Sequence, residues 1–205
     1  DMEIHYTTDG SEPTATSPLY EKIVPVKEAL TLKGAIFAHG RQMGKTLILP
    51  VRWNLATAKP VLGTNPTEKL LTNGIRGSLK YSDFEWCSWA DNDSVSFTID
   101  LLKLEMLNTL ILGCITNNGM AIHKPASVRV EVSDDNSKFR EAVVQSFTSE
   151  EIFREGNFIE NLSLKLGGTQ ARYVRVTAKG PGVCPASHVR PGQTSRIFFD
   201  EVMLE

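Results

Sequence analysis

The sequence lacks the features of several common protein classes. Basic residues are not in excess, because 22 Lys and Arg stand against 24 Asp and Glu, so no positive field exists to hold nucleic acid. The longest apolar runs, such as 47–51 and 110–115, fall far short of the roughly 20 residues of a membrane-spanning helix. No basic leader precedes an apolar stretch. We expect neither a nucleic-acid partner nor a membrane span, and the opening on Asp1 is typical of a segment of a longer protein.

Cysteine is scarce, and its spacing indicates no known framework. The chain has Cys87, Cys114 and Cys184, an odd number without a C-x-x-C pair, so neither a zinc site nor a disulfide framework is indicated. Four histidines are scattered, and no serine sits in a G-x-S-x-G turn, so Ser/His/Asp catalysis has no support.

Short alternating segments dominate what is present. In "SVRVEVS" Val128, Val130 and Val132 share one face, a period of two that is typical of a half-buried strand. In "RYVRVTA" the inward set is Val174, Val176 and Ala178. The other expected strands are 4–7, 30–37, 47–53, 96–101, 109–116, 159–166 and 197–204, and the one expected helical turn is 67–71. The pattern predicts an all-β protein, and the loop lengths suit a jelly-roll sandwich.

Four motifs invite a functional reading that the spacing or frequency does not support. "HGRQMGKT" (39–46) has three residues between its glycines instead of four and no helix after it, so a hairpin turn is expected. In "FFDEV" the adjacent carboxylates Asp200 and Glu201 should point to opposite faces of a strand, so they cannot act as a glycosidase pair. The tripeptides at Asn92 and Asn161 are expected to be chance glycosylation sequons.

The first fifty residues carry a family resemblance. "IHYTTDGSEPTATSPLYEKIVPVKEALTLKGAIFAHG" resembles the small immunoglobulin-like module that follows the catalytic barrel of chitobiases and β-N-acetylhexosaminidases. Asp9 can bond backbone groups ahead of it, Gly10 can take a positive φ and Pro13 restricts the exit, so each residue of the turn has a structural task. The leading strands expected of that module do not precede Asp1, so the resemblance implies an incomplete module over 1–53.

The remainder resembles the discoidin-like, coagulation-factor C-type jelly-roll, a group that includes family 32 carbohydrate-binding modules. The resemblance is carried in order by "AKPV", "LLTNGIRGS", "YSDFEW", "VSFTIDL", "PASVRVEVSDD", "ARYVRVTAKG" and "IFFDEVML". A shift to Asn, Ala, Thr, Lys and Pro after Trp53 places the domain boundary near Asn54, so the second domain is 54–205. "GVCPASH" resembles a loop of hexosaminidase tails, with Ser187 where those tails usually carry Trp.

This resemblance implies a structural calcium site. The expected ligands are Asn73, the Arg76 carbonyl, Ser78 and Glu201. Asn73 replaces a carboxylate of the family pattern, and calcium affinity depends on ligand charge. Two interpretations stay open, a metal site and a plain Asn73-Gly74 turn.

The resemblance also implies a glycan site on the loops at one end of the sandwich. There an aromatic face packs on a sugar ring while polar groups hold its hydroxyls. The candidates are Trp86, Trp89, Asn117, Asn118, His123, His188 and Arg190. Trp86 has a second interpretation as a core residue.

Taken together, these features predict a non-catalytic accessory region. Resemblance implies that its parent is a secreted, periplasmic or cell-surface bacterial β-N-acetylhexosaminidase-like hydrolase, and that its partners are the catalytic domain and glycans ending in galactose or N-acetylhexosamine. The alternative is a structural spacer that binds no sugar. The resemblance further places Cys87 and Cys184 in loops at the same end of the sandwich, with Cys114 as a buried strand thiol.

Overall fold

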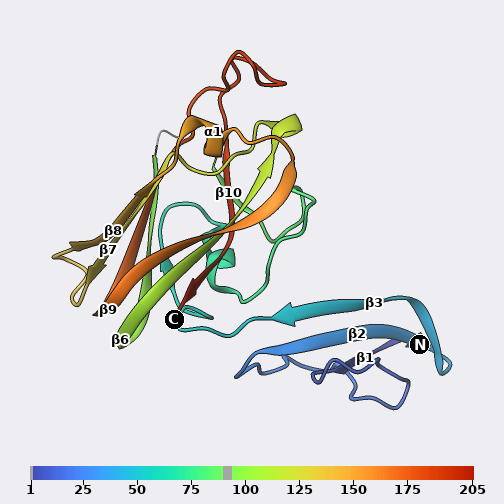
Figure 1. Ribbon diagram of the computed structural model, residues 1–205. Helices are drawn as coiled ribbons and strands as arrows, with labels where there is room; N and C mark the ends of the chain where they lie inside the picture. The colour runs from blue at the N-terminus through green and yellow to red at the C-terminus, as the bar shows by residue number, and fades with distance from the viewer. Residues whose placement is uncertain (1, 90–93) are drawn as a thin grey trace. The chain divides into compact units, whose positions relative to one another are not determined.

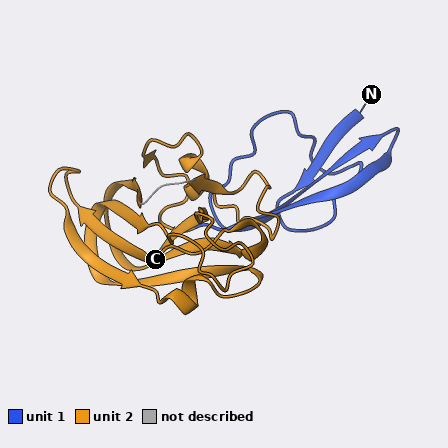
Figure 2. Cartoon of the chain, turned by 90° about the horizontal axis from the view of Figure 1, so that it is seen from above, with its two compact units in different colours: residues 1–53 blue, residues 54–205 orange. Residues whose placement is uncertain are grey.

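A computed structural model describes residues 2–89 and 94–205 of the chain. It divides into two compact units, 1–53 and 54–205, drawn in separate colours in Figure 2. Strands dominate both units, and the helices are one short α-helix and two 3-10 turns in the described residues. The expected all-β fold class is confirmed.

The first unit is built on one antiparallel sheet. It contains β1 (Met2–Thr7), β2 (Leu30–Ala38) and β3 (Arg41–Val51) in the order β1-β2-β3. His39 and Gly40 turn between β2 and β3 with positive φ values of 50° and 75°, the conformation of a tight two-residue hairpin. The segment 39–46 is therefore a hairpin, as predicted, and β3 begins six residues before the expected start at residue 47.

The turn after β1 forms as the sequence indicates. Asp9 Oδ1 accepts hydrogen bonds from the Ser11 amide at 3.0 Å and the Ser11 hydroxyl at 2.6 Å, and Gly10 has a φ of 78°. The chain then returns to β1, where the Tyr20 amide donates to the Ile4 carbonyl at 2.8 Å. Asp9 and Gly10 therefore hold the backbone of this turn as the sequence predicts.

The second unit is a sandwich whose strands form one hydrogen-bonded path, β5-β10-β6-β9-β7-β8, with β4 paired to β6. Two turns and a helix interrupt it: η1, η2 and α1. The bounds are β4 Val61–Leu62, η1 Glu68–Thr72, β5 Cys87–Trp89, β6 Ser94–Asn117, η2 Asn118–Met120, β7 Ser127–Ser133, β8 Arg140–Ser146, α1 Ser149–Ile152, β9 Asn157–Lys179 and β10 Ile197–Leu204.

Two long strands replace four expected ones. The segments 96–101 and 109–116 are parts of β6, and 159–166 and 172–178 are parts of β9. The pair bends where its register breaks, between Asp100 and Glu105 of β6, next to Leu102 with a φ of 69°. A second register shift, between Leu107 and Thr109 of β6, lies opposite Gly167 and Gly168 of β9. Both glycines have positive φ values, which glycine adopts at little cost. The sequence pattern predicts a break between the two segments of each pair, but it does not predict that strand pairing resumes beyond the break.

The bend places the two halves of β6 and β9 in two layers with the core between them. Val128, Val130, Val132, Val174, Val176 and Ala178 are all fully buried, which confirms the predicted inward faces. Each such valine contributes about 1.5 kcal/mol or more by burial. The bend also brings both ends of β6 and β9 to one end of the unit, together with α1 and the 180–196 segment, while the C-terminus lies at the other end (Figure 1).

Candidate functional site

Three connections meet at this end of the second unit, which we call the loop end. They are 118–126, 147–156 and 180–196, and backbone hydrogen bonds join them. Asn118 donates to the Gly156 carbonyl at 3.2 Å, and the His123 amide donates to the Arg196 carbonyl at 3.0 Å. Thr148 and Glu151 form a reciprocal capping box that starts α1 and so orients the middle connection.

Two of the predicted sugar ligands, His123 and His188, lie side by side beneath the surface. Their ring centroids are 5.0 Å apart, and Phe153 contacts both rings. His123 is 0% exposed and His188 is 8% exposed. Burial, followed by the neighbouring His188, lowers the pKa of His123 to about 4. Both rings are therefore covered, and the expectation that they hold sugar hydroxyls is wrong in this structure.

Cys184 completes this group. The ligand atoms of His123, Cys184 and His188 lie within 4.8 Å of one another. The Cys184 thiol is also 3.4 Å from the Ser195 hydroxyl. Sequence reasoning missed this cluster, because its members come from two loops and their spacing along the chain follows no standard metal pattern.

The other polar candidates surround the cluster. Asn118 is buried, and its amide nitrogen lies 3.4 Å from His188 Nε2. Asn117 exchanges backbone hydrogen bonds with Ile122. The Arg190 side chain donates to the Gly119 carbonyl, and its amide donates to His188 Nδ1 at 3.0 Å. The structure thus brings Asn118 and Arg190 next to His188, and both residues form hydrogen bonds with the neighbouring loops.

Neither predicted tryptophan platform is exposed. Trp89 is 8% exposed and packs on Phe97 and Phe199, with ring centroids 6.2 and 5.6 Å apart. Trp86 is 5% exposed, and its indole N–H donates to the Ser78 carbonyl at 3.1 Å. The prediction that Trp89 is an exposed stacking platform is wrong. Trp86 is a core residue, which was the second interpretation of its position. A short strand, β5, carries Trp89 inward, where burial of its large apolar surface stabilises the fold.

A hollow of about 420 Å³ opens on the loop end beside the histidine cluster. Phe153 gives it an aromatic side chain that is only partly buried. Its remaining lining side chains come from the α1 region and from the 180–196 connection: Ser149, Glu150, Arg154, Glu155, Pro185 and Ser187. Ser187 lines the hollow at the position where the family resemblance expects Trp. An apolar face with several charged and hydroxyl groups around it is the usual chemistry of a sugar site.

The predicted calcium ligands lie around the 73–78 turn. Glu201 Oε2 accepts from the Gly74 amide at 3.0 Å, and Asn73 Oδ1 accepts from the Ile75 amide at 2.8 Å. Glu201 Oε1 is buried without a hydrogen-bond partner in the described part of the chain. Burial raises the pKa of Glu201 to about 9. The Ser78 hydroxyl instead accepts from the Lys80 amide at 3.1 Å. The unpartnered carboxyl oxygen of Glu201 is the feature of this turn that a cation would satisfy.

Strand alternation predicts that Asp200 and Glu201 point to opposite faces, but both carboxylates contact the 73–78 turn. The register of β10 shifts between Phe199 and Val202, and this irregularity lets both carboxylates reach the same turn. Asp200 accepts from Arg76 Nε at 2.6 Å and from the Gly77 amide at 2.9 Å. Both side chains are 0% exposed, so a substrate has no access to them.

All three cysteines are free thiols. Cys114 is buried in β6, as predicted. Cys87 lies in β5 instead of a loop, and the Thr67 hydroxyl donates to its sulfur at 3.1 Å. Cys87 and Cys184 do not form a disulfide. The Cys87 sulfur contacts Thr67, whereas the Cys184 sulfur contacts Ser195.

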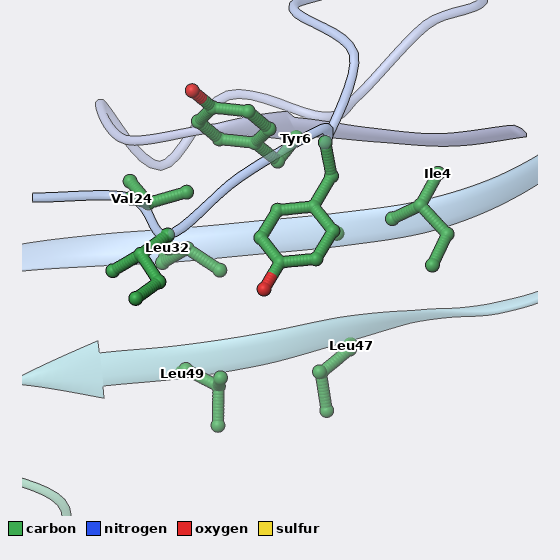
Figure 3. A pocket seen from close by; sticks show the side chains of 9 residues that line it. Ile4, Tyr6, Val24, Leu32, Leu47 and Leu49 are labelled. Carbon is green, nitrogen blue, oxygen red and sulfur yellow. The ribbon is translucent and has the colours of Figure 1, made fainter.

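The first unit has a hollow of another kind. Side chains from all three strands and from the 20–24 segment line a space of about 400 Å³ that is almost entirely apolar. Figure 3 shows Ile4, Tyr6, Val24, Leu32, Leu47 and Leu49 around it. The phenol hydroxyls of Tyr6 and Tyr20 are the polar side-chain groups of this lining, which has no charged or amide group.

Fold and loop end together define an all-β accessory module with a jelly-roll domain. Residues 56–189 match the F5/8 type C domain, and the chain belongs to that family. Residues 1–47 match the chitobiase/beta-hexosaminidase C-terminal domain. Both domains are accessory or carbohydrate-binding modules, not catalytic ones. No helix in the described residues is long and apolar enough to cross a membrane.

Solved structures similar to the chain include three bacterial modules. Chitosan-binding module 1 from a chitosanase/glucanase of Paenibacillus sp. IK-5 has a TM-score of 0.49 and 16% identity, covering 75% of this chain and 99% of the module. A fucose-binding module of Streptococcus pneumoniae has a TM-score of 0.45 and 18% identity, covering 75% and 97%. The C-terminal domain of a chitobiase from Bacteroides fragilis has a TM-score of 0.40 and 16% identity, covering 67% and 78%. No curated protein matches the chain.

Proposed function

We propose that the chain binds glycans through the hollow at the loop end of its second unit. The proposed ligand is a glycan terminus, galactose or an N-acetylhexosamine. The observation that carries the proposal is that Phe153 stands among charged and hydroxyl groups in an open hollow, on a domain of the F5/8 type C family.

The chemistry of the lining suits a sugar ring. The ring of Phe153 offers an apolar surface to the C–H face of a pyranose. Glu150 and Glu155 can accept hydrogen bonds from hydroxyls, and Ser187 can both donate and accept. Such a shallow site buries few groups, so we expect dissociation constants in the millimolar range and gains from repeated glycans on a surface.

Titration of the chain with individual sugars, followed by NMR, tests the site. Galactose, N-acetylgalactosamine, N-acetylglucosamine and chitin oligomers should be compared. A binding sugar should shift resonances of Phe153 and Ser187, and Phe153→Ala should weaken binding by up to about tenfold, as the loss of a stacking surface implies. Phe84→Ala is the matched control, because Phe84 is 92% exposed and does not line the hollow.

The alternative function is a spacer that supports a catalytic domain without binding sugar. It is favoured if a glycan array and the millimolar titrations give no response from a folded protein. Binding that survives Phe153→Ala but is lost in Phe84→Ala would place the site elsewhere on the unit.

A structural calcium ion is a further part of the proposal. Glu201, Asn73 and the Arg76 carbonyl would hold it, with Ser78 completing the set, and the ion would neutralise the buried Glu201 carboxylate. Since an ion that binds only the native state stabilises it by linkage, calcium should raise the melting temperature and chelator should lower it. Glu201→Gln should remove this response, and an unchanged wild-type melting temperature would leave only the turn.

We also propose that the chain is part of a β-N-acetylhexosaminidase-like hydrolase that is secreted, periplasmic or displayed at the cell surface. The match of residues 1–47 to the chitobiase/beta-hexosaminidase C-terminal domain supports this setting. Fusion of the chain to such a catalytic domain should raise its activity on a dense glycan surface and leave its activity on a soluble substrate unchanged.

A further inference from the structure

The cluster of His123, Cys184 and His188 has the donor set of a transition-metal site. Two imidazoles and one thiol converge from separate connections, with ligand atoms within 4.8 Å of one another and all three residues buried. We propose that these residues bind one zinc ion, which fastens the 180–196 connection to the segment before β7.

The distances require a small movement. With Zn–N and Zn–S bonds of about 2.0 and 2.3 Å, ligand atoms of a tetrahedral site lie about 3.3 to 3.7 Å apart. Since the three ligand atoms lie within 4.8 Å of one another, they must draw together by up to about 1 Å. Cys184 and His188 lie in one loop whose backbone is already closed, since Cys184 exchanges hydrogen bonds with Gln193 and Gly192 at 2.9 and 3.0 Å. The loop can approach His123 as a unit.

His123 supplies an independent observation that points to a ligand. The residue is 0% exposed, and neither ring nitrogen has a hydrogen-bond partner of normal geometry in residues 2–89 and 94–205, since the contact of the ring with the Ile152 backbone falls short of that geometry. Buried polar atoms are almost always paired, because an unpaired one forfeits its hydration without compensation. A metal ion between the rings and the thiol would satisfy one of these nitrogens.

The donor types select the metal. A thiolate with two imidazoles suits zinc, whereas calcium and magnesium require oxygen ligands. The Asn118 amide lies 3.4 Å from His188 Nε2, and the orientation that places its oxygen there accepts the Nε2 proton. That oxygen or a water molecule is the natural fourth ligand, which zinc sites with three protein side chains leave open.

His188 must exchange one interaction to bind through Nε2. Its Nδ1 now accepts from the Arg190 amide at 3.0 Å, so in the neutral ring the proton is on Nε2. Metal binding moves the proton to Nδ1 and gives up this hydrogen bond. The loss of this one hydrogen bond is offset by the metal–ligand bonds that form. Because zinc binds the folded arrangement of these ligands, its binding free energy adds to the stability of the fold.

Cobalt(II) titration of the metal-free, reduced chain tests the proposal, because cobalt replaces zinc and reports its ligands. We expect one equivalent to produce a thiolate-to-cobalt charge-transfer band and visible bands of tetrahedral intensity, and zinc to bleach both. One equivalent of zinc should also raise the melting temperature. A wild-type protein without the charge-transfer band, or with a melting temperature indifferent to zinc, would refute the site without any mutation.

Variants then assign the ligands. Cys184→Ser should abolish the charge-transfer band and weaken zinc binding by at least about 100-fold, more than loss of a supporting residue does. Cys87→Ser is the matched control, because it removes another buried thiol that has Thr67 as its neighbour instead of histidine. His123→Gln should lower affinity, and the exposed His39→Gln should not. A band that survives Cys184→Ser and disappears in Cys87→Ser would overturn the assignment. Sugar titrations of the zinc-loaded protein report on the hollow separately.

Discussion

Glu201→Gln should stabilise the second unit at neutral pH when calcium is removed. Burial raises the pKa of Glu201 from 4.5 to about 9, so the folded state retains a proton that the unfolded state releases above pH 4.5. Stability therefore falls as pH rises between these two values, by up to about 1.4 kcal/mol per pH unit. At pH 7 the cost reaches up to about 3 kcal/mol, and glutamine, which resembles the protonated acid, avoids it.

Urea unfolding at pH 5, 6, 7 and 8 in chelator measures this effect. Fluorescence of the buried Trp86 and Trp89 reports on the second unit. The wild type should lose stability steadily across the series, and the variant should lose less. Glu141→Gln on the exposed face of β8 controls for the loss of a carboxylate. Burial raises the pKa of Asp200 as well, so a residual slope in the variant is expected. Equal slopes in wild type and Glu201→Gln would refute the reasoning.

Three other predictions concern the core. Trp89→Ala should lower the free energy of unfolding, measured by urea unfolding, by about 3 to 5 kcal/mol. A variant of unchanged stability with a reduced glycan affinity would instead indicate that Trp89 contacts the sugar. Gly113→Ala should destabilise far more than Gly119→Ala in the same assay, because a Cβ at 113 would overlap Asp200 Oδ1 and the Arg76 guanidinium; comparable midpoints would contradict this. Burial raises the pKa of Cys87 to about 12, so its reaction with a thiol reagent at pH 8 should wait for unfolding, and rapid labelling of Cys87 by mass spectrometry would count against the packing.

The candidate site shows where prediction from sequence stops. Asn118, His123, His188 and Arg190 were expected at one end of the sandwich, and they do meet there. The burial of the two histidines was not predictable, because Phe153 and the 180–196 connection, which cover them, are distant from His123 in the sequence. Phe153 itself carried no signal in the sequence. Phe153 is the C-cap residue of α1, a four-residue helix that begins at the Thr148 capping box.

The sequence by itself determined the local structure: the Asp9-Gly10 turn, the His39-Gly40 hairpin and the alternating valines of β7 and β9. These features depend on backbone preferences and on a period of two, which neighbouring residues express without outside help. Only the tertiary structure decided that β6 and β9 each run across a bend, that Trp89 belongs to the core, and that Asp200 and Glu201 share one turn. Those outcomes depend on which segments, far apart in the sequence, pack against the same surface. The spacing of residues along the chain does not predict that packing.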